Sequence, residues 1–345
     1  MFYNPDMALD RDLGVAFASA YFGPTARHGW DMLSATGARG LRLLAESGAF
    51  SAFLFTEAHP DAVEVVRENA RAFPGATVRA GDAREIPTEA PFDYVDLDPY
   101  GSPLGFVPTG IRALRLGGVL AVTATDMMVL AGVQPGACER RYGSHPVRGR
   151  LGPEGGLRIL LAYLARVARE EGRTVRPVLA YVRGHHLRAY LEVPSLALTS
   201  PPDPVGVVDP EAWTGPFLGD RGPYGPMWLG PLLDAPLASR MTTPPTAADP
   251  RATEEFLARI RSESDVDRPF YYEANELAGA LGVPFPPSRE SLSLALVDRG
   301  FRFSRTHMRP EGFRTDAPRT VVEETVRSLG ERAVPRSSRA SGSDR

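Results

Sequence analysis

The sequence predicts an α/β protein, with a domain built on a mostly parallel sheet followed by a smaller C-terminal α+β domain. The first half of the chain alternates strand-like and helix-like stretches, which is typical of parallel strands connected by helices. Prolines and glycines then crowd into residues 194–250, which marks a change in organisation. Helix-like stretches return beyond residue 250 and lead into a short strand and a turn.

The individual elements of the first half follow from the spacing of apolar residues. We expect strands at 29–33, 51–56, 77–82, 92–98 and 118–125, and two late strands near 175–193, joined by Gly184 and His185. Helical spacing predicts helices at 40–47, 61–73 and 157–170. A parallel sheet of this kind brings the carboxyl ends of its strands to one edge, where ligands bind.

The proline-rich stretch divides the chain into two domains. We expect residues 1–197 to form the sheet domain, residues 198–333 a second domain, and the polar tail 334–345 to be disordered. Within the second domain, helices are expected at 251–264, 273–282 and 288–300, then a strand at 301–307 and a turn at 309–314. Helices followed by a strand and a turn predict a winged-helix-like module.

The composition is that of a soluble cytoplasmic protein without a metal. Of the 345 residues, 43% are hydrophobic, and no apolar run approaches the roughly 18 residues that span a membrane. The single cysteine, Cys138, excludes internal disulfides and a cysteine-based zinc site. All 39 basic residues are arginines, which fits coding bias. Because the net charge is −3, arginines could bind phosphate only locally, in the arginine-rich stretches 139–150 and 299–319.

A glycine turn follows the first strand. The strand carries Asp31, and the turn reads SATGARG at residues 34–40, so that Gly37 lets the backbone approach a ligand at a helix N-terminus. A plain tight turn is an equally good interpretation of this stretch alone. Two further acids end the next strands: Glu57 is placed to accept ribose hydroxyls, and Asp82 to contact an adenine edge. Together they predict a nucleoside-bearing cofactor.

The fourth strand ends in the turn DPYG, residues 98–101. The exocyclic amine of a base is a poor nucleophile because its lone pair is delocalised into the ring. Asp98 and the carbonyl of Pro99 can accept hydrogen bonds from such an amine, and Asp98 can take its proton. Tyr100 offers a ring on which an extruded base can stack. The motif therefore predicts methylation of a base amine, and the alternative is a structural turn without chemistry.

Across nearly its whole length the chain resembles the archaeal-type tRNA (guanine-26, N2)-dimethyltransferase family. The blocks that carry the resemblance occur in the family order: FYNPDMALDRD (2–12), DMLSATGARGLR (31–42), VDLDPYGSP (95–103), VTATD (122–126), CERRYG (138–143), EGGLRIL (154–160), GPMWLGPL (225–232) and THMRPEGFRTDAP (306–318). The resemblance implies a Rossmann-like class I methyltransferase that uses S-adenosylmethionine and binds tRNA, acting as a cytoplasmic monomer.

The resemblance also implies roles for particular residues. Asp98 matches the catalytic acid in the DPYG turn, and Phe2 and Tyr100 match two aromatics that would sandwich the flipped guanine. Arg11 and Arg39 match positions that contact the cofactor. The remaining cofactor positions that we expect are Asp31, Gly37, Glu57, Ala58, Asp82 and Ala83, and Pro99 completes the catalytic turn.

The expected activity is transfer of one or two methyl groups from S-adenosylmethionine to N2 of guanine 26 in tRNA. Two alternatives stay open from the residues alone. One is an amino-methyltransferase that acts on another tRNA guanine or on a DNA base; the other is a non-catalytic RNA-binding protein with a methyltransferase fold. Asp126, after the fifth strand, either orients the site or caps the next helix.

Overall fold

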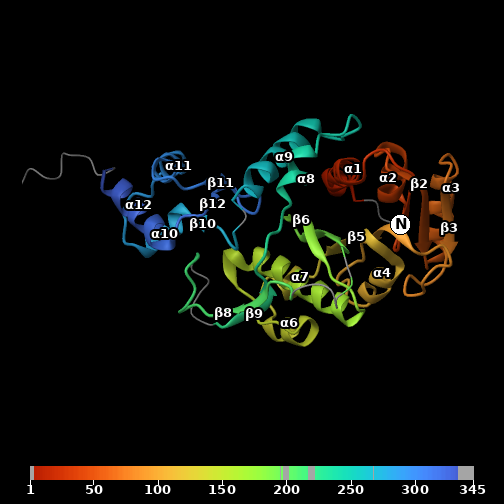
Figure 1. Cartoon of the computed structure of the whole chain (residues 1–345), viewed down its shortest axis with the longest axis horizontal. Helices are drawn as coiled ribbons and strands as arrows, with labels where there is room; N and C mark the ends of the chain where they lie inside the picture. The colour runs from red at the N-terminus through yellow and green to blue at the C-terminus, as the bar shows by residue number, and fades with distance from the viewer. Residues whose placement is uncertain (1–3, 195, 197–201, 217–221, 267, 333–345) are drawn as a thin grey trace, which may run out of the picture.

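The computed structural model describes residues 4–194, 196, 202–216, 222–266 and 268–332. Two parts lie side by side along the longest axis of the molecule (Figure 1). The larger part contains the sheet of the first half of the chain, and the smaller part, blue in the figure, contains the last helices. Helix α9 lies between them.

The larger part is built on a seven-stranded sheet in the order β3-β2-β1-β4-β5-β7-β6. Strands β1 to β5 pair in parallel, whereas β7 runs antiparallel to both β5 and β6. The strands are β1 (Arg27–Asp31), β2 (Phe50–Glu57), β3 (Ala76–Ala80), β4 (Phe92–Leu97), β5 (Leu114–Ala124), β6 (Arg176–Arg183) and β7 (His186–Glu192). All of the strands predicted in the first half are confirmed, including the hairpin that turns at Gly184 and His185.

Helices cover both faces of this sheet. Helices α1 and α2 pack together on one side, and α4 and α7 pack together on the other (Figure 1). The helices are α1 (Ala8–Phe22), α2 (Ala38–Glu46), α3 (Pro60–Ala70), α4 (Val107–Ala113), α5 (Met127–Leu130), α6 (Pro135–Tyr142) and α7 (Gly152–Glu170), with the short 3-10 turns η1 (Pro5–Met7) and η2 (Gly149–Leu151). The predicted helices correspond to α2, α3 and α7, whereas α1 is a helix that we did not predict.

Strand β4 lies in the middle of the core and fixes the position of the turn that follows it. Every residue of β4 is buried, and Tyr94, Val95 and Leu97 have no exposed surface. Helices on both faces bury such a strand completely, so its apolar residues need not alternate with polar ones. The two acids within it, Asp93 and Asp96, are buried too and require charged partners.

Residues 205–271 belong to the same core as the sheet, although they follow the proline-rich boundary. The hairpin of β8 (Val205–Val208) and β9 (Tyr224–Trp228) packs against α7, and helix α8 (Ala235–Arg240) leads to α9 (Pro250–Ser264). The N-terminus of α9 is capped by Asp249, whose side chain accepts from the amide of Ala252, with Pro250 at the first position. The main hydrophobic cluster extends to Tyr271, and a second begins at Tyr272. A functional division at residues 197 and 198 stays a prediction.

The C-terminal module is a small α/β unit with the strand order β10-β12-β11. The chain runs through one strand, two helices, a hairpin and a final helix, and the last strand lies between the other two, as in a winged helix. Its elements are β10 (Tyr272–Glu273), α10 (Ala274–Ala280), α11 (Arg289–Asp298), β11 (Phe303–Arg305), β12 (Gly312–Thr315) and α12 (Arg319–Arg332). The winged-helix-like arrangement predicted for this region agrees with this topology.

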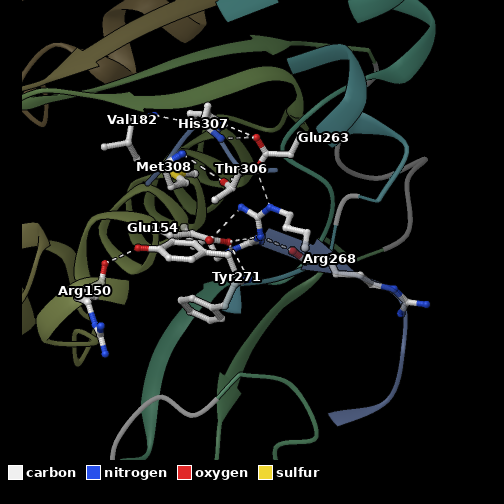
Figure 2. A network of polar contacts seen from close by, with 12 residues as sticks. Arg150, Glu154, Val182, Glu263, Arg268, Tyr271, Thr306, His307 and Met308 are labelled. Carbon is white, nitrogen blue, oxygen red and sulfur yellow. Dashed lines mark hydrogen bonds and ion pairs between the residues drawn. The ribbon is translucent and has the colours of Figure 1, made fainter. Parts of the chain in front are cut away.

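A buried network of charges joins the two parts (Figure 2). Arg314 of β12 binds Glu154 of α7 through two nitrogens, at 3.0 and 3.1 Å, and Glu263 of α9 through its Nε, at 2.6 Å. All three side chains are at most 1% exposed. Burial alone would raise the pKa of both glutamates, but the neighbouring cations hold each pKa below its usual range. The network therefore stabilises the contact between the two parts only while both carboxylates are ionised.

His307 extends this network to the edge of the sheet. Its Nδ1 lies 2.6 Å from Glu263, and its Nε2 accepts a hydrogen bond from the backbone amide of Val182 in β6 (Figure 2). The ring therefore links the Glu263 carboxylate to the backbone of β6. Thr306 donates to the same glutamate. Elements from both parts therefore meet on the Glu263 carboxylate.

Replacing Arg314 by alanine should destabilise the fold strongly, because it leaves the carboxylates of Glu154 and Glu263 buried without this cation. We expect the free energy of unfolding, measured by guanidinium denaturation, to fall by about 3–5 kcal/mol. Arg305→Ala is the matched control, since its pair with Glu290 is exposed and should be worth about 1 kcal/mol or less.

The effect of Arg314→Ala should also depend on pH. A carboxylate whose folded pKa is depressed contributes stability above its unfolded pKa, and this contribution is lost as the pH falls. The difference between wild type and Arg314→Ala should therefore shrink below the ordinary glutamate pKa of 4.5. Equal, pH-independent effects of Arg314→Ala and Arg305→Ala would contradict the network.

Candidate active site

A cavity of about 440 Å³ opens at the carboxyl ends of β1, β2 and β4. The strand order reverses direction between β1 and β4, and this switch point is where open α/β sheets bind ligands. The N-terminal segment, the glycine turn and the DPYG turn form its wall. The lining residues are Asn4, Met7, Arg11, Asp31, Leu33, Ser34, Ala35, Thr36, Ala38, Arg39, Glu57, Asp98, Pro99, Tyr100, Phe106, Thr123 and Thr125.

Glu57 shapes the glycine turn. One of its oxygens accepts from the amide of Ala35 at 2.9 Å, and the other accepts from the amides of Ala58 and His59 at 2.9 and 3.0 Å. Ala35 has a φ of 48° and Gly37 a φ of 74°, so the turn uses the left-handed region twice before α2 begins. Glu57 thus holds the turn open at the cavity wall.

Arg39, at the start of α2, lies among acids at the floor of the cavity. Its Nη2 donates to Asp98 at 2.9 Å, and its Nε lies 3.9 Å from Asp96. The side chain is only 9% exposed, and its Nη1 has no hydrogen-bond partner within the described residues. Burial and the neighbouring Asp96 raise the pKa of Asp31 to about 8. The floor thus contains an acid that exchanges protons near neutral pH and one unsatisfied guanidinium nitrogen.

Asp96 is fixed from below by a second buried arginine. Arg188 of β7 binds both carboxylate oxygens of Asp96, at 2.6 and 3.1 Å, and Tyr94 donates to the same carboxylate. Burial would raise the pKa of Asp96, but Arg188 and Arg39 hold it below its usual range. Asp96 therefore stays ionised and locks the last residues of β4 against β7.

The DPYG turn is held by residues from β5 and α6. The amide of Gly101 donates to Thr125 Oγ1 at 2.7 Å, and Ser102 Oγ lies 3.1 Å from the hydroxyl of Tyr142. Tyr142 donates in turn to Asp126 at 2.8 Å. Asp126 is the N-cap residue of α5 but makes no side-chain capping bond to it, and its orienting role stays a prediction. Tyr100 itself is 85% exposed.

The N-terminal wall depends on two buried aspartates of α1. Asp10 accepts from Tyr181, His186 and Arg183 of the β6–β7 hairpin, at 3.1, 2.7 and 2.7 Å. Asp12 is fully buried and accepts from Arg42 of α2, and also from the amide of Ala248 and the hydroxyl of Thr253 at the start of α9. Arg11 lies between them and turns toward the cavity, where it donates to the carbonyl of Asn4.

Neither aspartate was predicted as a functional residue. The FYNPDMALDRD block contains both, but nothing in its spacing indicates partners more than 170 residues away for Asp10 or at α9 for Asp12. His186 was not predicted as a functional residue either. Nothing in the sequence distinguishes it from the loop at Gly184, yet its side chain is buried against Asp10.

The structure brings most of the predicted site residues to the cavity. Its wall contains Arg11, Asp31, Arg39, Glu57, Asp98, Pro99 and Tyr100. Gly37 and Ala58 flank this wall without lining it. Asp82 and Ala83 do not line it either: Ala83 is buried, and the carboxylate of Asp82 binds Arg84, which lowers its pKa to about 2. Phe2 lies outside the described residues.

The described residues contain neither a metal-ligand cluster nor a membrane-spanning helix. No group of three or more potential metal ligands occurs among them. Within the same ranges, no helix is long and apolar enough to cross a membrane.

The strand order, the antiparallel β7 and the cavity at the switch point define a Rossmann-like class I methyltransferase. The N2,N2-dimethylguanosine tRNA methyltransferase family matches residues 1–200 and 218–327. The chain belongs to this family. The resemblance that the sequence blocks indicated is therefore confirmed.

Known proteins similar to the chain agree over nearly its full length. A tRNA (guanine(26)-N(2))-dimethyltransferase of Thermococcus kodakarensis is 35% identical over 95% of this chain and 93% of its own length. That of Pyrobaculum arsenaticum is 35% identical over 95% of this chain and 91% of its own length. The solved structure of Trm1 from Pyrococcus horikoshii in complex with S-adenosyl-L-methionine matches with a TM-score of 0.82, at 31% identity and with 94% of each chain covered.

Tyr142→Phe should lower kcat without weakening the binding of the cofactor. Burial raises the pKa of Tyr142, so its hydroxyl keeps the proton that it donates to Asp126. Removing the hydroxyl frees Ser102 and the turn that carries Tyr100. A hydrogen bond to a charged group is worth about 1.5–3 kcal/mol, so we expect kcat to fall by about 10- to 100-fold. Steady-state kinetics and calorimetry of S-adenosylmethionine binding measure both quantities.

Tyr163→Phe is a suitable control for this variant. Tyr163 lies on α7 and packs edge-on against Tyr142, but no hydrogen bond links it to the turn. Two outcomes would contradict a positioning role for Tyr142. One is loss of activity in both variants; the other is a Tyr142→Phe variant that binds S-adenosylmethionine more weakly while its kcat changes less.

Proposed function

We propose that Asp98 and Tyr100 perform the base methylation for which the fold is built. The chain is a tRNA (guanine-26, N2)-dimethyltransferase that uses S-adenosylmethionine. The observation that carries the proposal is the state of Asp98: Arg39 binds its Oδ2, while no hydrogen bond reaches its Oδ1 within the described residues. One carboxylate oxygen is thus oriented and the other is available to a substrate in the cavity.

The cavity residues suit the cofactor. S-adenosylmethionine, when bound, supplies a methyl group on a positively charged sulfur. Asp31 and Asp98 offer negative charge on the wall of the cavity. Arg39 Nη1 is buried and has no hydrogen-bond partner within the described residues, so it fits a carboxylate. Glu57, at the end of β2, is the acid placed to accept ribose hydroxyls. Asp82 would join this site only by giving up part of its contact with Arg84.

The chemistry follows from the turn after β4. Asp98 Oδ1 and the carbonyl of Pro99 accept the two N–H groups of guanine N2, which holds its lone pair out of conjugation with the ring. As the new N–C bond forms and the methyl–sulfur bond breaks, N2 gains positive charge, and Asp98 takes the proton. The nitrogen then still carries one hydrogen, and Asp98, after releasing the first proton to solvent, can accept it in a second transfer. Tyr100, exposed at the mouth, stacks on the extruded base.

The rest of the chain has supporting roles in this proposal. Residues 198–333, which include the winged-helix-like module, hold the body of the tRNA. We propose a monomer as the active species. A tRNA substrate supports the cytoplasm as the location of the enzyme.

Asp98→Asn should abolish turnover and spare tRNA binding. Asparagine keeps a hydrogen-bond acceptor but loses the base and the pair with Arg39, and loss of a general base costs about 10²- to 10⁴-fold. Methyl transfer from labelled S-adenosylmethionine to tRNA transcripts, followed by nucleoside mass analysis, measures this. Wild-type enzyme should give N2-methylated guanosine, and a transcript with guanine 26 replaced should give none. Methylation of the transcript that lacks guanine 26 would refute guanine 26 as the target. A fully active Asp98→Asn variant would refute Asp98 as the general base.

The affinity for S-adenosylmethionine should rise with pH up to about 8. A cation binds the ionised form of Asp31, whose pKa in the free site is raised to about 8, so binding below that pH must release a proton. Between pH 6 and pH 8 we expect the Kd to fall by up to about tenfold per pH unit. Calorimetry in buffers of different ionisation enthalpy counts the released proton. Asp31→Asn should bind more weakly and lose this dependence; an unchanged slope in the variant would assign the titration to another group.

A further inference from the structure

Three arginines beside the active site remain free of strong ion pairs. Arg140 and Arg141 on α6 and Arg148 after it are exposed. Within the described part of the chain, Arg140 and Arg148 make no ion pair or side-chain hydrogen bond, and the ion pair of Arg141, with Asp126, is 4.0 Å long. Three like charges this close in sequence repel one another, which is unfavourable for the free protein and favourable for binding an anion.

The second arginine-rich stretch, residues 299–319, differs in this respect. Arg314 is buried between two glutamates, and Arg302 lies 2.8 Å from Asp316. The others are also paired: Arg299 with Glu324, Arg305 with Glu290, Arg309 with Glu273 and Arg319 with Glu323. Although both stretches are rich in arginine, only the first presents charge that is not already neutralised.

The free arginines are connected to the turn that carries Tyr100. Tyr142, the last residue of α6 and the neighbour of Arg141, contacts Ser102 two residues after Tyr100. Arg148 lies against the turn between α5 and α6, because a Cβ on Gly132 would come within 2.9 Å of its Cγ. These contacts place the segment that carries the arginines next to the turn that follows Tyr100.

Exposed apolar side chains occupy the same segment. Met128 is 55% and Val133 61% exposed, and the amide of Gln134 closes the turn between them by donating to the carbonyl of Met128. The nearby acid Glu139 is bound to His145 at 2.7 Å, and Asp126 is held by Tyr142, so neither carboxylate is left unpaired among these arginines. Guanidinium groups interleaved with exposed apolar side chains suit a ligand that alternates phosphates with sugars and bases.

We propose that the α5–α6 surface, made of Met128, Val133, Arg140, Arg141 and Arg148, binds the phosphates of the tRNA nucleotides next to the target guanine. The inference rests on the proposed function and adds the place where the flanking backbone is held. A base leaves its stack only when the strand on either side is restrained, and phosphate contacts beside the cavity provide that restraint. The winged-helix-like module then binds a more distant part of the tRNA.

The triple variant R140A/R141A/R148A tests this surface. We expect the KM for tRNA to rise at least tenfold, with the Kd for S-adenosylmethionine unchanged. Each lost phosphate contact lowers the slope of log affinity against log salt by about 0.7–0.9, so filter binding from 50 to 200 mM salt should show a slope smaller by about two units or more. The lysine variant R140K/R141K/R148K keeps the charge and should restore most of the affinity.

A matched control removes three arginines from other helices. R67A/R71A/R112A changes the net charge equally, but these side chains pair with Glu64, Glu68 and Glu171 and lie outside residues 198–333. We expect tRNA affinity and salt slope close to those of wild type. The surface is refuted if R140A/R141A/R148A matches the control, or if its defect appears in cofactor binding. Because filter binding needs no turnover, it tests the surface even if wild-type enzyme were to leave guanine 26 unmethylated, which would count against the proposed function alone.

Discussion

The geometry of the active site depends on Arg39, a cation that lies among Asp31, Asp96 and Asp98 at the end of the sheet. Without it, three carboxylates would face one another at the carboxyl ends of two neighbouring strands, where burial already raises the pKa of Asp31. Arg188 contributes from below by neutralising Asp96. Two arginines against three acids leave the floor with a deficit of positive charge. Once Asp31 is ionised, a cationic cofactor complements this deficit.

The framework around this floor consists of contacts between distant segments. Asp10 fixes α1 to the β6–β7 hairpin, Asp12 fixes it to α2 and α9, and Tyr142 fixes α6 to the DPYG turn. In each case a buried polar group has partners on another element, as burial in a low-dielectric interior requires. The catalytic turn and the N-terminal wall are therefore held by side chains that do not themselves line the cavity.

Most of the fold could be predicted from the sequence, and so could the presence of Asp31, Glu57 and Asp98 at one edge of the sheet, because local patterns specify them, whereas Arg11 and Arg39 came from the resemblance alone. Apolar runs such as residues 92–98 predict buried strands, and acids at strand ends converge at one edge. Helix α1 escaped prediction because it is buried on most sides, acids included, and so lacks an apolar stripe. The pair of Arg39 with Asp98 joins residues 59 positions apart, which no spacing rule indicates. The position of Asp82 away from the cavity likewise depends on its local contact with Arg84.

Helix α9 contacts the active-site wall near one end and the winged-helix-like module near the other. Thr253 donates to Asp12, and Glu263, ten residues later, binds Arg314 and His307. An α-helix rises about 1.5 Å per residue and does not stretch, so these two anchor points are held about 15 Å apart. The helix thus acts as a ruler between the methyl-transfer site and the module. In the proposed function, this fixed length sets the distance between the methyl-transfer site and the part of the tRNA that the module holds.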